Sequence, residues 1–89
     1  MLEKAKIILR ITNNAYDEEI TDLINAAFLD LAEAGVTNTD DTDELIIRAV
    51  MTYVKANFGW QNNEAERLDK AYEHLKTHLT LTSTYGGDL

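Results

Sequence analysis

Residues 43–59 read DELIIRAVMTYVKANFG and predict the helix around which the chain folds. The apolar residues of this stretch recur at helical spacing and cover more than half of the helix circumference: Leu45, Ile46, Ile47, Ala49, Val50, Met51, Tyr53, Val54 and Phe58. A helix with so broad an apolar surface is expected at the centre of a bundle or against a second surface. We expect it to span about residues 43–58, with Asp41 and Glu44 spaced as a capping box and Gly59 ending it.

Three further helices are predicted, at about residues 2–11, 15–34 and 63–79. In the longest, apolar residues lie three or four positions apart and share one face: Ile20, Leu23, Ile24, Ala27, Leu31 and Ala34. Asn14 is expected to cap its start and Gly35 to end it in a left-handed conformation. Asn63, with Glu66 three residues later, is expected to cap the last helix. The predicted fold is therefore all-α, a small bundle of four helices forming one domain over residues 1–79.

The C-terminal residues 80–89 form a different pattern. Leu79, Leu81, Ser83 and Tyr85 alternate with threonines, which is the period of a strand, and Gly86-Gly87 follow. An extended segment in a helical chain must find backbone partners, so an arm exchanged with another molecule is one interpretation. The other is a frayed terminal tail.

Composition excludes several classes of protein. The 89 residues include 16 acidic and 8 basic side chains, a net charge of -8, which opposes binding to nucleic-acid phosphates or anionic membranes. There is no cysteine, so disulfide frameworks and thiolate metal sites are excluded. The N-terminal apolar run, residues 7–9, is too short for a signal core or a membrane span, and no cleavable signal is expected.

No catalytic, cofactor or metal residues are predicted. His74 and His78 have the spacing of two zinc ligands on a helix, but no further ligand accompanies them. In the acidic loop at residues 38–44, no starting point supplies both the glycine and the bidentate glutamate that an EF-hand needs. Ser83 has no glycine elbow, and the glycines do not form a phosphate loop. The chain is therefore expected not to be an enzyme and to take no small-molecule substrate.

The candidate functional residues are instead partner contacts. Trp60 follows the glycine that ends the third helix, where an indole either fills the core or anchors a partner. The full set of candidate interface residues is Met51, Phe58, Trp60, Leu81, Tyr85, Gly86 and Gly87.

The order of these segments resembles the phage head-tail connector family, small helical proteins between portal and tail. The resemblance rests on LEKAKIILRI at residues 2–11 followed by the acidic helix start at 17–19, on IIRAVMTYVKANFG at 46–59, and on YEHLK at 72–76 followed by Leu79 and Tyr85-Gly86-Gly87. It covers almost the whole chain.

The resemblance implies a ring of identical subunits under the portal protein, which extends the DNA channel and docks head-closure or tail proteins. DNA would pass through without specific binding, and the protein would reside in the virion, after assembly in the host cytoplasm. The family implies no catalytic residues. A small acidic regulator or inhibitor that occludes one basic target is the alternative, and an enzyme built on His74 and His78 is a more distant one.

Overall fold

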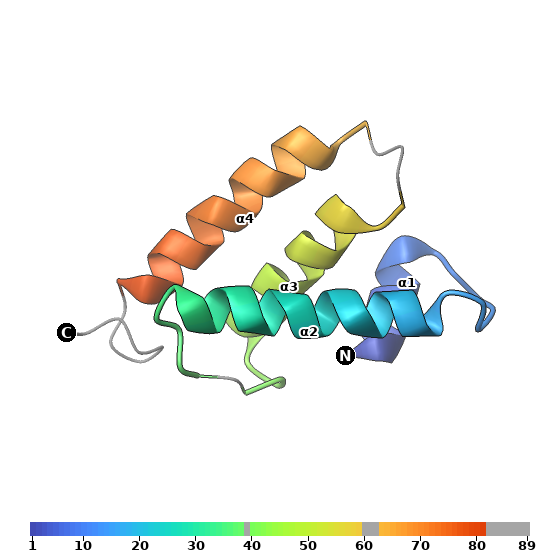
Figure 1. Cartoon of the computed structure of the whole chain (residues 1–89), viewed down its shortest axis with the longest axis horizontal. Helices are drawn as coiled ribbons and strands as arrows, with labels where there is room; N and C mark the ends of the chain where they lie inside the picture. The colour runs from blue at the N-terminus through green and yellow to red at the C-terminus, as the bar shows by residue number, and fades with distance from the viewer. Residues whose placement is uncertain (39, 60–62, 82–89) are drawn as a thin grey trace.

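The computed structural model describes residues 1–38, 40–59 and 63–81. It contains four helices, α1 (Leu2–Leu9), α2 (Asp17–Glu33), α3 (Glu44–Asn57) and α4 (Ala65–Thr80), and no strand within the described residues (Figure 1). The predicted all-α class and the number of helices are confirmed. The expected interface residues Trp60, Tyr85, Gly86 and Gly87 lie outside the described residues.

Helix α3 occupies the centre of the fold. Helices α2 and α4 pack against it from two sides, and α1 packs against both α2 and α3. Figure 1 shows that α2 and α4 converge near their C-terminal ends and diverge toward the other end, where α1 lies beside α2. The broad apolar surface of residues 43–58 is thus explained, because more than one helix covers it.

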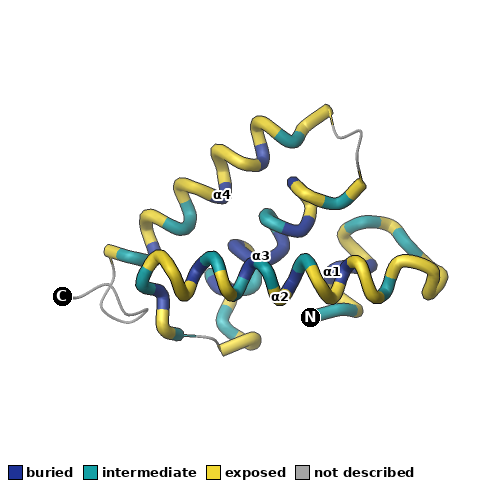
Figure 2. The backbone as a smooth tube through the Cα atoms, in the orientation of Figure 1, coloured by how far each residue is buried: buried dark blue, intermediate teal, exposed yellow. Residues whose placement is uncertain are grey.

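The core forms where these helices meet α3, and Figure 2 shows its buried positions along the inner sides of the helices. Ala49, Val50 and Val54 of α3 are at most 1% exposed. The other buried apolar residues of this cluster are Ala5, Ile20, Ile24, Ala27, Leu31, Val36, Ile46, Met51, Tyr72 and Leu79. Every helix therefore contributes side chains to one continuous core.

Helix α1 ends at Leu9, two residues before the predicted end, because Arg10 adopts a left-handed conformation with φ 60° and ψ 41°. The Arg10 amide donates to the Ile7 carbonyl at 3.1 Å, and the Ile11 amide donates to the Lys6 carbonyl at 2.9 Å. These two bonds form a Schellman motif, which usually has glycine at the left-handed position.

Helix α2 begins at Asp17 and not at residue 15, and the predicted Asn14 cap is wrong. Tyr16 occupies the cap position without a side-chain hydrogen bond to the helix. Asn14 Oδ1 instead accepts a hydrogen bond from Lys6 Nζ at 2.9 Å, and the same ammonium lies 2.9 Å from Asp17 Oδ1. The Asn14 side chain therefore joins α1 to the start of α2.

The end of α2 follows the prediction. Gly35 has φ 103°, a backbone conformation that residues with a side chain rarely adopt. The Gly35 amide donates to Ala32, and the Val36 amide donates to Leu31. Val36 and Leu31 are both 1% exposed, which is the apolar contact that accompanies this motif.

Helix α3 is capped by Asp43, so the predicted pairing of Asp41 with Glu44 is wrong. Asp43 Oδ1 accepts from the amides of Leu45 at 2.9 Å and Ile46 at 3.3 Å. The sequence offers several acids in a row, and the one immediately before the first helical residue makes the bonds. Gly59, with φ 77°, follows the end of α3 as expected.

Helix α4 begins at Ala65, later than the predicted residue 63, with Glu64 at its cap position and no side-chain cap. Asn63 is therefore not the cap. The helix continues through Thr80, and Leu79 is 1% exposed in the core. Leu79 and Thr80 thus belong to the helical period, and only residues after them can form the predicted arm.

Arg10 offers a direct test of the α1 terminus. Replacing Arg10 with glycine removes the Cβ that disfavours the left-handed region, whereas replacing it with alanine removes the guanidinium but keeps that Cβ. We expect Arg10→Gly to be more stable than Arg10→Ala by about 1 kcal/mol in urea unfolding. Equal stability of the two variants would contradict the left-handed assignment.

Candidate partner-binding site

A groove of about 640 Å³ lies between α1, α3 and α4. We call it the basic groove. It is lined by Lys4 and Ile8 of α1, by Glu44, Leu45, Ile47, Arg48, Met51, Thr52 and Lys55 of α3, and by Leu68 of α4. Apolar side chains thus share this surface with three cations.

The periodicity of α3 builds this groove. Positions 44, 48, 51 and 55 recur at spacings of four, three and four, so they share one side of the helix. Ile46, Ala49, Val50 and Val54 are buried in the core. The apolar excess noted in the sequence therefore divides into a core face and a groove face.

The charge of the groove is opposite to that of the chain. Three basic side chains and one acidic side chain line it, a formal charge of +2 in a protein of net charge -8. Lys4 and Arg48 form no ion pair with any residue that the structure describes. Lys55 contributes positive potential at Glu64, whose pKa is held below its usual value chiefly by its hydrogen bond and ion pair with Arg67.

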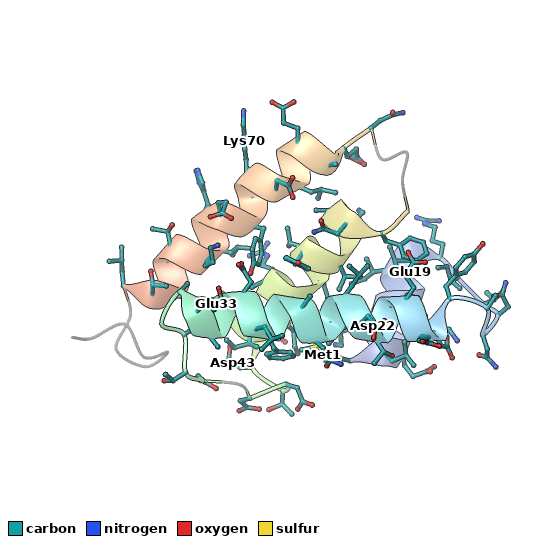
Figure 3. The ribbon with its side chains drawn as sticks, in the orientation of Figure 1. Met1, Glu19, Asp22, Glu33, Asp43 and Lys70 are labelled. Carbon is teal, nitrogen blue, oxygen red and sulfur yellow. The ribbon has the colours of Figure 1, made fainter. Side chains whose placement is uncertain are left out.

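An acidic stripe runs along α2. It consists of Glu18, Asp22, Leu29 and Glu33, whose spacings of four, seven and four place them on one side of the helix. All four are exposed, and Leu29 is 65% exposed. Figure 3 labels Asp22 and Glu33 of this stripe, together with the neighbouring Glu19. The stripe thus places an apolar side chain between carboxylates.

A polar cluster joins α2 to α4. Asp30 Oδ2 accepts a hydrogen bond from Tyr72 Oη at 2.6 Å and another from Lys76 Nζ at 3.0 Å. The Tyr72 ring packs edge-on against Tyr53, with 5.1 Å between centroids, and Lys76 Nζ lies 5.3 Å from the Tyr72 ring centre. This cluster therefore links α2 and α3 to α4 through side-chain contacts.

The cluster changes two pKa values. Partial burial acts to raise the pKa of Asp30, but the hydrogen bonds from Tyr72 and Lys76 and the charge of Lys76 outweigh it and hold the pKa below its ordinary value. Burial, together with the hydrogen bond to Asp30, raises the pKa of Tyr72. At neutral pH, Asp30 is therefore ionised and Tyr72 is a hydrogen-bond donor.

Three of the predicted interface residues, Met51, Phe58 and Leu81, lie within the described residues, at separate places on the fold. Met51 lines the basic groove and is 6% exposed. Phe58 packs edge-on against Tyr16 with 5.6 Å between ring centroids, and Leu81 is 77% exposed just after α4. Neither Phe58 nor Leu81 lines the groove.

Sequence reasoning missed most of the groove. Arg48 and Lys55 could have been found from their spacing with Met51 on α3. Lys4 and Ile8 could not, because only the packing of α1 brings them to that side of α3.

Acidic and histidine side chains elsewhere have local roles or face solvent. Asp40 accepts hydrogen bonds from the Thr42 hydroxyl at 2.6 Å and the Thr42 amide at 2.9 Å, and both bonds lower its pKa. His74 and His78 are both exposed on α4. Among residues 1–38, 40–59 and 63–81, no group of three or more potential ligands is arranged to hold a metal, and no helix is long and apolar enough to cross a membrane.

Comparison with known proteins gives one family. The model of the family described as phage connector protein matches residues 1–86. No curated protein and no solved structure gives a significant match.

The cluster around Asp30 predicts a pH-dependent effect of Tyr72→Phe. The variant loses a hydrogen bond to a carboxylate whose side chain is 38% exposed, so we expect a loss of about 1 kcal/mol near pH 7. The pKa of Asp30 is lower in the folded protein than in the unfolded chain. The stabilisation that ionised Asp30 contributes is therefore complete above the unfolded pKa of about 3.9, and it is lost as pH falls through the folded pKa. The difference between the two proteins should therefore shrink in strong acid.

Urea unfolding at several pH values measures this difference. Tyr16→Phe is the matched control, because the Tyr16 hydroxyl makes no hydrogen bond to a described residue and the ring contact with Phe58 is kept. A Tyr72→Phe loss that is independent of pH would contradict the role assigned to Asp30.

Proposed function

The chain belongs to the phage connector protein family, and on this premise we propose that it is a structural subunit of a phage or prophage head-tail connector. Several copies assemble as a ring under the portal protein. The match over residues 1–86 of the 89-residue chain is the observation that carries this proposal.

The proposed ring extends the DNA channel below the portal and docks head-closure or tail proteins. A virion location follows from this role, with assembly in the host cytoplasm. The basic groove and the acidic stripe support it, because they lie on different helices and offer surfaces for more than one neighbour.

DNA is proposed to pass through the ring without specific binding. The net charge of -8 opposes contact with phosphates, and carboxylates near the channel would repel DNA over a screening length of about 8 to 10 Å in physiological salt. The role is mechanical in this proposal and needs no catalytic residues, cofactor or small-molecule substrate.

The chain is proposed to consist of a helical domain and a C-terminal arm. The helical domain extends through Thr80 and its cap Leu81, so an assembly arm would comprise residues 82–89, which lie outside the described residues. The strand-like alternation supports this proposal.

Binding to the portal protein tests the proposed function. The purified chain is mixed with the portal of the same phage or prophage, and the mass of the complex is measured by light scattering. We expect several copies per portal ring, since a preformed ring raises the effective concentration of subunits. A chain that stays monomeric and does not bind the portal would overturn the proposal, and binding to one basic host protein instead would favour a regulator.

Truncation tests the arm separately. A chain ending at Leu81 keeps the buried Leu79, so its helical circular dichroism should match that of the full chain. If residues 82–89 act as an arm, portal-dependent assembly should weaken by about tenfold or more. Normal assembly of the truncated chain would rule out the arm.

A further inference from the structure

The basic groove has a complementary surface on the same molecule. We propose that the groove of one subunit receives the acidic stripe of a second copy of this chain, forming a head-to-tail contact. This inference rests on the proposed function, because it assigns the subunit-to-subunit surfaces of the proposed ring.

The positive charge of the groove favours an acidic segment as its binding partner. Lys4 and Arg48 are exposed at the groove and form no ion pair with a described residue, so an acidic segment gains attraction there without first breaking a salt bridge. Four of the five basic residues outside the groove are already paired: Lys6 with Asp17, Arg67 with Glu64, Lys70 with Glu66, and Lys76 with Asp30 and Glu73. The fifth, Arg10, lies alone at the end of α1 and forms no ion pair with a described residue. The groove thus brings together two cations, Lys4 and Arg48, whose charge is left for a partner.

The acidic stripe has the chemistry to occupy it. Leu29 is 65% exposed, and Asp22 and Glu33 lie on the same side of α2, before and after it in sequence. A helix that inserts one apolar side chain between flanking carboxylates matches a groove lined by Ile8, Ile47 and Met51 with cations among them. Burial of Leu29 would remove the most exposed large apolar side chain of α2 from water.

The length of the groove fits the part of the stripe around Leu29. Residues 44–55 of α3 line the groove over roughly 16 Å, and residues 22–33 of α2 span the same length of roughly 16 Å. The groove can therefore hold the stripe from Asp22 to Glu33, with Leu29 between these two carboxylates.

The placement of the two surfaces favours repeated assembly. The groove is formed by α1, α3 and α4, whereas the stripe lies only on α2, so one subunit can use both surfaces at once. A contact between two different surfaces is heterologous, and copies joined in this way form a ring if the rotation between neighbours closes.

The net charge keeps this contact weak in the free protein. Two chains of net charge -8 repel each other as they approach within a Debye length of about 8 to 10 Å, and this repulsion offsets part of the attraction between groove and stripe. A portal ring that holds several copies close together would overcome this repulsion. The contact is thus suited to form on a template.

Site-directed cross-linking tests the contact. The chain has no cysteine, so Ile8→Cys and Leu29→Cys, at positions that are 37% and 65% exposed, introduce thiols only at the groove and the stripe. The full chain carrying both substitutions is treated with a short bismaleimide, alone at high concentration and bound to the portal. We expect a ladder of cross-linked oligomers, and heterodimers when the two single variants are mixed.

Charge reversal identifies the groove as the receiving surface. Lys4→Glu combined with Arg48→Glu should reduce the cross-linked yield by about tenfold, and the further changes Asp22→Lys and Glu33→Lys should restore it. Lys70→Glu is the matched control, because Lys70 is an exposed cation of α4 outside the groove. Circular dichroism confirms that each variant is folded.

Several outcomes would overturn the inference. The first is that no ladder of cross-linked oligomers forms, either from the free chain or on the portal. The second is that a single variant cross-links with itself as efficiently as the mixture of the two does. The third is that Lys70→Glu lowers the cross-linked yield as much as the groove reversal does. Portal binding by a chain that gives no ladder would show that the proposed function holds while these surfaces do not form the contact. A ladder from a chain that does not bind the portal would show that these surfaces form the contact while the proposed function fails.

Discussion

The burial of α3 is the constraint on which the rest of the structure depends. Ala49, Val50 and Val54 are almost completely removed from water by helices packed on two sides of α3. Full burial of one aliphatic side chain contributes about 1.5 to 3 kcal/mol, which is a large share of the stability of a small domain. Helices α2 and α4 are held in place mainly because each covers part of α3, and α1 completes the enclosure beside α2.

Polar contacts then link the outer helices to one another. Lys6 joins α1 to the start of α2 through Asn14 and Asp17, and Asp30 joins α2 to α4 through Tyr72 and Lys76. Each set of contacts joins α2 to a helix that lines the groove, which is α1 in the first case and α4 in the second. The basic groove is therefore already formed in the isolated subunit, and the subunit would not have to rearrange to bind a partner there.

The sequence predicted the helices because their signals are local, whereas the caps and the groove depend on neighbours. Apolar periodicity and the glycines at 35 and 59 locate the helices and two of their ends. The predicted caps Asn14, Asp41 and Asn63 were wrong because the first helical residue decides which residue stands at the cap position. Asp43 caps α3, whereas the residues before α2 and α4 make no side-chain cap bond. Met51 was predicted as a partner contact and lines the groove, but its neighbours Lys4 and Ile8 come from α1, and only tertiary packing brings them there.

Residue-resolved native-state hydrogen exchange of the free subunit tests the central role of α3 most directly. We expect the amides of Ala49, Val50 and Val54 to exchange only through global unfolding, with the same free energy as urea unfolding. The amides of α1, a helix of 8 residues, should exchange through smaller local openings. Exchange of the α3 amides as fast as those of α1 would contradict an account in which α3 organises the fold and preforms the groove.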